Sequence, residues 1–339
     1  MRAAALRLLT EEDCPPDALA DERVAVLGYG NLGRAFALNL RDSGVGNLRV
    51  GNRADAYAKN ARQDRFPTLE IPAATREADL VLVMLPDEVI PEVFSQQIAP
   101  WLSPHAAVVF ASGYVLAYGL IEPPSQADVL LLAPRMNGAM IRELYTQGRG
   151  AHAYVSVEQD RSGRGGPRLL GLAQALGALR AGVLELDARR EANLDLFIEQ
   201  TLGAVLGYAI MTAFNVGVKA GLPPEALAME MYMYGEMEMV WRGFRTEGYR
   251  RSASAHGPTA MYGGLLRTLE LMQTDLADRF RRIWEEIQTG QFAAKLQTER
   301  RHGYPLLNGI QTLAKWFDPM TATEKQLQSV LGQNDSRKD

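Results

Sequence analysis

The fold of this chain is decided near its beginning, at Val24-Ala25-Val26-Leu27 followed by Gly28-Tyr29-Gly30-Asn31-Leu32-Gly33. The apolar run predicts a buried strand, and the residues from Arg34 to Leu40 predict a helix that begins at the glycine turn. Gly28 allows the tight turn, Gly30 lets the backbone approach a pyrophosphate, and Gly33 permits close packing of helix on strand. The phosphates would bind at the helix N-terminus. We therefore predict a dinucleotide site formed by Gly28, Tyr29, Gly30, Asn31, Leu32 and Gly33.

Further strand-like segments follow this loop, and helix-compatible segments alternate with most of them. The segments are Leu48–Val50, Leu80–Met84, Ala107–Phe110, Val129–Leu132 and Ala153–Val157. This alternation predicts a parallel sheet that is covered by helices on both faces.

The pattern changes near residue 187. From Arg189 to Leu331 almost every segment has helical periodicity, with breaks at Gly221–Pro224, Gly257–Pro258 and Gly303–Pro305. We therefore predict an α/β Rossmann domain over residues 1–186, an all-α domain over residues 187–333, and a disordered tail over residues 334–339.

Composition indicates a soluble enzyme with two domains: 339 residues, 47% hydrophobic and 22% charged, with a net charge of −4. The mildly acidic balance argues against nucleic acid as a partner, and the basic run from Arg161 to Arg168 is interpreted as a loop. The single cysteine, Cys14, excludes an internal disulfide framework, and the four histidines lack zinc spacing. The N-terminus has no signal-peptide pattern, so we expect a cytoplasmic protein.

One segment, from Thr201 to Val218, contains no charged residue and approaches the length of a membrane span. Its polar residues Tyr208, Thr212 and Asn215, and the lack of a second such segment, favour a buried core helix over a membrane helix.

Two carboxylates, Asp195 and Glu199, lie one helical turn apart in apolar surroundings in the sequence Asp195-Leu-Phe-Ile-Glu199. At this spacing both face the same way, as a Mg²⁺ site requires. An acidic pair on a helix is more often a solvated face, and Glu191 extends the stripe as a solvated face would. The two interpretations stay open on these residues alone.

The choice of cofactor depends on Gly51-Asn52-Arg53-Ala54-Asp55, at the end of the second strand of the Rossmann pattern. Arg53 could hold the 2′-phosphate of NADPH, and Asn52 stands where an NAD enzyme often has an acid. Asp55 opposes this because its charge repels phosphate. We favour NADPH and keep NADH as possible.

Several motifs, in order, resemble those of the ketol-acid reductoisomerases. They are Gly28-Tyr-Gly with Ala37–Gly44, Leu85-Pro86-Asp87-Glu88, Phe110-Ala-Ser112-Gly113-Tyr114, Ala133-Pro-Arg135, Asp195–Gln200 and Thr259–Gly263. The resemblance runs from about residue 17 to about residue 315 and is far more specific than the glycine loop alone. It implies a Rossmann domain, then a knotted helical domain through which two subunits form a homodimer.

The resemblance also implies chemistry. Those enzymes use two Mg²⁺ ions to drive an alkyl migration in acetolactate and then reduce the resulting 2-oxo acid with a nicotinamide hydride. It implies further cofactor contacts at Leu85, Pro86, Asp87 and Gly113. It places catalytic residues at Asp195, Glu199, Glu230, Arg135 and Ser112, and it makes Asp195, Glu199 and Glu230 the metal ligands.

The sequence departs from the family pattern at four positions around the expected substrate. Ser112 replaces a histidine, Gly257 replaces a serine that holds the substrate carboxylate, and Tyr234 replaces a glutamate ligand of the second metal. Arg135 replaces a lysine, and arginine is not a neutral substitute for it.

These losses fall on the alkyl migration, which needs a doubly metal-polarised ketol, more than on hydride delivery. We therefore favour a diverged member that reduces a small oxo or imino acid, with the isomerase step weakened or lost. The alternatives are an authentic ketol-acid reductoisomerase of branched-chain amino-acid biosynthesis and a non-catalytic nucleotide-binding scaffold.

Overall fold

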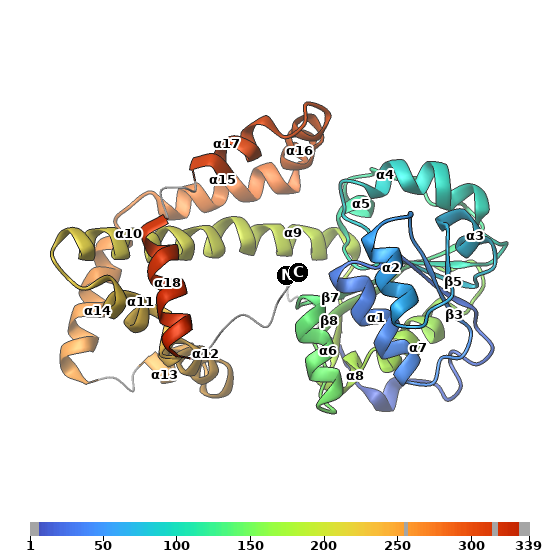
Figure 1. The fold of residues 1–339 in the computed structure, drawn as a ribbon, viewed down its shortest axis with the longest axis horizontal. Helices are drawn as coiled ribbons and strands as arrows, with labels where there is room; N and C mark the ends of the chain where they lie inside the picture. Colours follow the sequence, from blue (N-terminus) through green and yellow to red (C-terminus); the bar gives the residue numbers. More distant parts are fainter. Residues whose placement is uncertain (1–6, 254–256, 314–317, 332–339) are drawn as a thin grey trace. The chain divides into compact units, whose positions relative to one another are not determined.

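The computed structural model describes residues 7–253, 257–313 and 318–331. The chain divides into two compact units, a first unit of Met1–Asp195 and a second unit of Leu196–Asp339 (Figure 1). The predicted disordered tail, residues 334–339, lies outside the described residues.

The first unit is built on one sheet. Its nine described strands have the order β1-β9-β8-β7-β6-β5-β2-β3-β4. Their bounds are β1 Leu8–Leu9, β2 Val24–Leu27, β3 Leu48–Gly51, β4 Thr68–Leu69, β5 Leu80–Val83, β6 Ala107–Phe110, β7 Asp128–Pro134, β8 Ala153–Gln159 and β9 Val183–Glu185. The strand-like segments expected from the sequence are all strands, and β1, β4 and β9 are additional short ones at or near the edges.

The prediction of a parallel sheet holds for β4, β3, β2, β5, β6 and β7, which are all parallel to one another. It is wrong for β8, which pairs antiparallel with β7 from Pro134↔Ala153 onward. Strands β8 and β9 are parallel to each other, and β1 pairs antiparallel with β9. Helix α6 (Gly138–Thr146), which separates the two strands in sequence, packs against α1 (Asn31–Asp42). After α6 the chain returns to the end of β7, where the Arg135 N–H donates to the His152 carbonyl at 2.9 Å, and β8 runs backward from there.

Helices cover both faces of this sheet, as predicted. Every residue of β2, β5 and β6 is buried. One face packs Val24 and Val26 in a cluster with Phe36 of α1 and Leu172 of α7 (Gly165–Ala175). On the opposite side Phe94, which opens the π-helical turn η2 (Phe94–Ile98), lies 6.0 Å from the ring of Phe110. The other helices of this unit are α2 Ala56–Gln63, α3 Ile71–Arg76, α4 Ile90–Val93, α5 Tyr114–Ala117 and α8 Ala178–Ala181.

The strand order reverses at β2, which lies between β3 and β5. The chain proceeds from β2 to β3 and β4 on one side and then places β5 on the other side. Ligands of open α/β sheets bind in the crevice that such a reversal leaves at the carboxyl ends of the strands. The glycine loop after β2 and the Leu85–Asp87 segment after β5 both lie at this point.

The part of the chain described beyond residue 187 is entirely helical, as predicted. Helix α9 (Ala188–Ile198) continues through a π-helical turn, η4 (Glu199–Gly203), into α10 (Ala204–Lys219). The three expected breaks are present: α11, α14 and α17 begin at Pro224, Pro258 and Pro305. The remaining helical elements are α11 Pro224–Ala228, η5 Met229–Met233, α12 Glu236–Glu247, α13 Tyr249–Ala253, α14 Pro258–Leu271, α15 Leu276–Gln288, α16 Gln291–Arg301, α17 Pro305–Leu313 and α18 Asp318–Val330.

The interpretation of Thr201–Val218 as a buried core helix is wrong for this chain taken alone. Only Thr201, Phe214 and Gly217 of the segment are buried, because the second unit does not cover the apolar sides of α10. In the described chain one helical run, Ala188–Lys219, is long and apolar enough to span a membrane by length and composition, with 17% of its most apolar window buried.

The expectation of a loop from Arg161 to Arg168 is also only partly correct. Helix α7 begins at Gly165, and Arg168 is buried inside the first unit. Its guanidinium donates to Glu22 (Nε to Oε1, 3.0 Å), to Asp128 (Nη1 to Oδ2, 3.0 Å) and to the carbonyl of His105. A buried cation is tolerated here because each of its three nitrogens donates to a carboxylate or a carbonyl.

Removing this cation should destabilise the first unit strongly. We expect Arg168→Met to lower the free energy of unfolding by about 3–5 kcal/mol, because Glu22 and Asp128 would be left buried without their partner. The matched control is Arg164→Met, which removes a mostly exposed partner of the same Glu22 and should cost about 0–1 kcal/mol. Urea unfolding followed by circular dichroism measures both, and equal losses in the two variants would contradict the assignment.

Candidate functional site

Three polar side chains follow three neighbouring strands of the sheet. Asp87 follows β5, Ser112 follows β6 and Arg135 follows β7. Because these strands are parallel, their carboxyl ends meet at one edge of the sheet. Helix α9 supplies Glu191 and Asp195 to the same place, through contacts with Gly113 and Arg135.

Glu191 lies at the centre of this group. Its side chain is 2% exposed, and its two oxygens accept from the Gly113 N–H at 2.7 Å and from Arg135 Nη1 at 2.6 Å. Burial raises the pKa of Glu191, while these two donors act to lower it. The interpretation of Glu191 as part of a solvated face is therefore wrong, and it is the site residue that sequence reasoning missed. Its four-residue spacing from Asp195 was the available signal.

Gly113 is required for this arrangement. A Cβ on Gly113 would lie 2.2 Å from the backbone oxygen of Ala188, the first residue of α9. The absence of a side chain therefore lets the loop after β6 touch the start of α9. This contact is what allows the Gly113 N–H to reach Glu191.

Arg135 joins the two carboxylates of α9. Its second terminal nitrogen, Nη2, makes a close ion pair with Asp195 Oδ1, and the guanidinium lies 5.2 Å from the ring centre of Tyr154. The planar fork of arginine can bind two carboxylates at once, which the ammonium of a lysine does less specifically. The position where the family pattern has a lysine is thus occupied by a group that engages Asp195 directly.

Asp87 is the other acid of the group. Ser112 Oγ donates to Asp87 Oδ2 at 3.1 Å and accepts from the Tyr114 N–H at 3.2 Å. Burial raises the pKa of Asp87 to about 6. The hydrogen bond from Ser112 acts to lower this pKa, and the negative charges of Glu191, Glu88 and Asp195 act to raise it further. Asp87 is nevertheless only half-buried, so solvent and ligands can reach it.

The glycine loop has the geometry that a dinucleotide requires. Gly28 has φ = +94°, and a Cβ on Gly33 would lie 2.0 Å from the Gly28 oxygen, so both positions demand glycine. A Cβ on Gly30 would meet nothing within 4 Å, which leaves the backbone open to a ligand at the start of α1. This open approach at a helix N-terminus fits a pyrophosphate.

Two predicted residues of this loop have their side chains engaged elsewhere. The Tyr29 hydroxyl donates to Asp64 Oδ2 at 2.9 Å inside the unit. Asn31 Oδ1 accepts from the Gly138 N–H at 2.6 Å and so ties α1 to α6. Both residues could contact a cofactor only through other atoms. Leu32 is half-buried in α1.

Arg53 and Asp55, the residues expected to decide cofactor choice, bind each other. Arg53 Nε donates to Asp55 Oδ2 at 2.8 Å, and the Arg53 side chain is 86% exposed. Asp55 also caps α2 by accepting from the Tyr57 and Ala58 N–H groups. Burial acts to raise the pKa of Asp55, and the bonds from Arg53, Ala58 and Tyr57 lower it to a greater extent. A 2′-phosphate would have to take Arg53 away from Asp55.

The remaining expected metal ligands belong to the second unit. Glu199 begins the π-helical turn η4, and Glu230 lies exposed in the π-helical turn η5. Within the described residues no three side chains of His, Cys, Asp or Glu gather into a metal-binding group. In the first unit Arg135 engages an oxygen of Asp195 that a metal would need.

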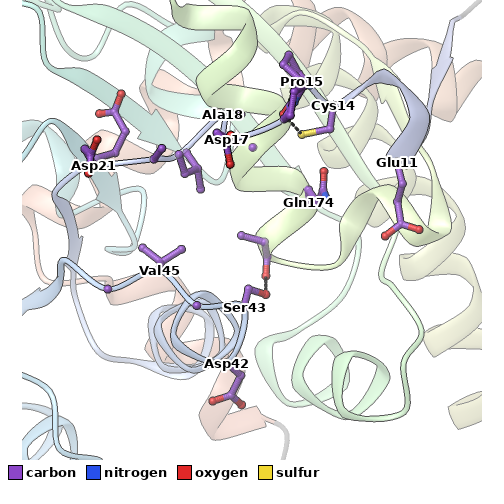
Figure 2. Close-up of a pocket in the computed structure, with 18 of the residues that line it drawn as sticks. Glu11, Cys14, Pro15, Asp17, Ala18, Asp21, Asp42, Ser43, Val45 and Gln174 are labelled. Atoms are coloured by element: carbon purple, nitrogen blue, oxygen red, sulfur yellow. Dashed lines mark hydrogen bonds between the residues drawn. The ribbon is translucent and has the colours of Figure 1, made fainter.

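A large hollow of about 880 Å³ lies elsewhere in the first unit (Figure 2). It is lined by residues that precede β2 and β3, including Asp17, Asp21 and Asn47, and by Ser43 after α1. These residues stand at the amino ends of the strands, opposite the glycine loop. The hollow is therefore separate from the candidate site.

The glycine loop lies at the reversal of strand order, and beside it Asp87 and Arg135, at strand ends, meet Glu191 and Asp195 of α9. This arrangement indicates a Rossmann-fold oxidoreductase that uses a nicotinamide cofactor. Residues 18–182 match the family model for the acetohydroxy acid isomeroreductase NADPH-binding domain, and residues 189–332 match that for the ketol-acid reductoisomerase C-terminal domain. The chain belongs to the ketol-acid reductoisomerase family, whose members are NAD(P)H-dependent oxidoreductases.

Individual relatives of this chain carry names of the same family. A Methanocaldococcus jannaschii protein named ketol-acid reductoisomerase (NADP(+)) is 35% identical over 313 residues, which cover 91% of this chain and 94% of that protein. A Metallosphaera sedula protein named ketol-acid reductoisomerase (NAD(P)(+)) is 33% identical, with 96% of each chain covered. A solved structure of an NADH-preferring ketol-acid reductoisomerase from an uncultured archean has a TM-score of 0.88 and 29% identity, and covers 95% of this chain and 98% of that one.

The Arg53–Asp55 pair generates a prediction about cofactor preference. Asp55→Ser should shift the ratio of NADPH to NADH affinity towards NADPH by about tenfold, or 1.4 kcal/mol, because it frees Arg53 and removes a charge that repels phosphate. Serine remains a good N-cap, so α2 should stay intact. Fluorescence titration of both cofactors measures the ratio, and Asp55→Asn, which also keeps the cap, should move it in the same direction. An unchanged ratio in both variants would remove Asp55 from cofactor selection.

Proposed function

We propose that this protein uses a nicotinamide hydride to reduce the C=O or C=N bond of a small 2-oxo or imino acid, and that the isomerase step of its family is weakened or lost. The observation that carries the proposal is the contact of Arg135 with both Glu191 and Asp195. It occupies a carboxylate that an alkyl migration would require for metal binding.

The alkyl migration and the hydride reduction require different groups in the site. The alkyl shift needs a ketol polarised by metal ions and a group that can exchange protons, whereas hydride delivery needs a bound nicotinamide and a polarised double bond. An arginine guanidinium keeps its proton, so it serves as a fixed cation and not as an acid or base. Arg135 therefore suits the polarisation of a substrate oxygen better than it suits migration.

We assign the catalytic roles accordingly. Arg135 binds or polarises an oxygen of the substrate, and Ser112 offers a hydroxyl at the adjacent strand end. Asp195, Glu199 and Glu230 are the carboxylates proposed for metal binding. Their oxygens are the hard ligands that Mg²⁺ prefers, but the Arg135–Asp195 pair competes with an ion, so we propose that Mg²⁺ is held weakly. When bound, Mg²⁺ would act as a Lewis acid on the substrate.

The proposed cofactor contacts surround the reversal point of the sheet. They are Gly28, Tyr29, Gly30, Asn31, Leu32, Gly33, Arg53, Asp55, Leu85, Pro86, Asp87 and Gly113. The exposed Arg53 and the NADP(+) names of several relatives support NADPH as the preferred cofactor. The Asp55–Arg53 pair and the NADH-preferring structural neighbour support NADH as the alternative cofactor.

A second candidate function is that of an authentic ketol-acid reductoisomerase of branched-chain amino-acid biosynthesis. The names of relatives that are 33–38% identical over most of the chain favour it. The non-catalytic scaffold is disfavoured because the glycine loop and the acid–arginine cluster are both assembled.

We also propose a cytoplasmic homodimer formed through the helical unit. Large apolar side chains along α10 are exposed, among them Leu202, Val205, Leu206, Tyr208 and Val216. Exposed large apolar side chains gathered along one helix are typical of an interface. The family membership favours a second copy of this chain over a membrane as the partner that covers it, and nucleic acid is not expected.

Substrate choice separates the two candidate functions. We expect little cofactor oxidation with acetolactate, and measurable oxidation with 3-hydroxy-3-methyl-2-oxobutanoate, which skips the alkyl shift. Arg135→Lys combined with Tyr234→Glu restores two residues of the family pattern and should therefore raise acetolactate turnover by about tenfold or more. A tenfold change corresponds to about 1.36 kcal/mol of activation free energy. The measurement is absorbance at 340 nm with and without Mg²⁺. Robust Mg²⁺-dependent turnover of acetolactate by the unmodified protein would instead establish the authentic enzyme.

The proposed dimer has its own test. Light scattering after size exclusion should give a mass of two chains, and Leu202→Glu with Leu206→Glu should give one chain, because two charges would enter an apolar interface. The matched control adds two glutamates to exposed helix α2 of the first unit, as Lys59→Glu with Asn60→Glu, and should remain dimeric. A dimeric Leu202/Leu206 variant would place the interface elsewhere.

A further inference from the structure

Reduction of a carbonyl requires a proton as well as a hydride, and the proposed function does not say which group provides it. We infer that Asp87 is the general acid of the reduction, with Ser112 as the residue that positions its carboxyl. This inference rests on the proposed reduction, and it applies equally if the substrate is first rearranged, because the same hydride step follows.

The place of Asp87 in the fold supports this role. It follows β5, the strand next to β2 and its glycine loop, so it stands at the reversal point where the nicotinamide should lie. Ser112, at the end of the adjacent β6, donates to Oδ2. Among the described residues no other side chain or backbone group is hydrogen-bonded to the Asp87 carboxyl, so Oδ1 is available to a ligand.

Ser112 itself is fixed, because its Oγ also accepts from the Tyr114 N–H at the start of α5. The hydroxyl therefore keeps one orientation, with its proton directed at Asp87. A serine held in this way orients the carboxyl of Asp87 but does not act as the acid itself. If it gave up its proton it would become an alkoxide, which is far too basic to form at neutral pH.

The other ionisable groups of the site are less suited. Both oxygens of Glu191 accept N–H bonds, from Gly113 and Arg135, so neither oxygen is open to a substrate. Asp195 is paired with the same arginine. Glu88, beside Asp87 in the chain, adds negative charge that favours a protonated Asp87.

Tyr114 is the remaining candidate donor. Its hydroxyl is buried and has no hydrogen-bond partner among the described residues. Burial, followed by the charge of Asp87, raises the pKa of Tyr114 to about 12. It therefore releases its proton less readily than Asp87, whose pKa of about 6 lies near neutrality, where a general acid works best.

The step balances without a further reactant. A bound reduced nicotinamide would supply the hydride, with its two electrons, that forms the new C–H bond at the carbonyl carbon. The π electrons of C=O move to the oxygen, and that oxygen takes the proton from Asp87 Oδ1. The products are the hydroxy acid, the oxidised nicotinamide and the Asp87 carboxylate, which regains a proton from water.

The first test is kinetic. For the substrate that the unmodified protein reduces, Asp87→Asn should lower kcat/KM by about 10²–10⁴-fold. The assays use saturating cofactor, so that a change in cofactor affinity, which fluorescence measures, does not enter the comparison. The activity of the unmodified protein should fall as pH rises through the pKa of Asp87, because only the protonated acid can donate. This falling limb should vanish in Asp87→Asn. In Ser112→Ala it should move to higher pH, because the lost hydrogen bond stabilised the carboxylate.

The matched control is Glu88→Gln, which removes the neighbouring carboxyl. It should keep the falling limb and displace it, if at all, to lower pH, because a charge that raises the pKa of Asp87 is gone. A purely structural role for Asp87 would lower activity at all pH values without moving the limb in Ser112→Ala, and that result would overturn the inference.

A second measurement does not depend on turnover. In protein labelled with ¹³C at the aspartate carboxyl carbons, one resonance should titrate near pH 6, disappear in Asp87→Asn and shift to higher pH in Ser112→Ala. If Asp87 titrates in the ordinary range of aspartate, the inference is wrong even where reduction is observed. If the titration is found but no oxo or imino acid is reduced, the proposed function fails instead.

Discussion

The first unit depends at its carboxyl edge on a single buried carboxylate. Glu191 accepts the N–H of Gly113 after β6 and the guanidinium of Arg135 after β7, so it fixes two strand ends and the start of α9 relative to one another. A carboxylate with almost no exposed surface is tolerated only when such donors compensate its charge. The direction of α9, and with it the position of Asp195, follows from this compensation.

Arginine at position 135, where the family pattern has lysine, determines how many carboxylates are paired with the cation at this edge. The guanidinium presents several N–H donors in one plane and can therefore hold Glu191 and Asp195 together. A lysine ammonium would satisfy Glu191 and leave Asp195 freer to bind a metal ion. The same substitution thus stabilises the edge of the sheet and draws a potential metal ligand into an ion pair, which is the physical basis of our proposal that the alkyl migration is weakened or lost.

Much of the fold could be predicted from the sequence because its signals are local. The glycine loop, the fully apolar strands and the proline-marked helix starts each depend on a few adjacent residues. The direction of β8 could not be predicted, because it depends on where the chain rejoins the sheet after α6, at the end of β7. The burial of Glu191 and Arg168 was missed for a related reason: a charged residue is read as exposed unless its partners, which lie 40 or more residues away, are known. The knot in the helical domain stays a prediction.

The candidate site contains one more consequence of charge. Asp87, Glu191 and Asp195 bring three carboxyl groups to the carboxyl edge, and Arg135 is the cation that contacts two of them. Three carboxylates beside one guanidinium would leave excess negative charge in a partly desolvated place, and like charges resist ionisation together. Arg135 pairs with Glu191 and Asp195 and, in the described part of the chain, leaves Asp87 without a cationic partner. Burial, aided by the charges of Glu191, Glu88 and Asp195, raises the pKa of Asp87. The placement of this cation therefore also supports the proposal that Asp87 is the acid of the site.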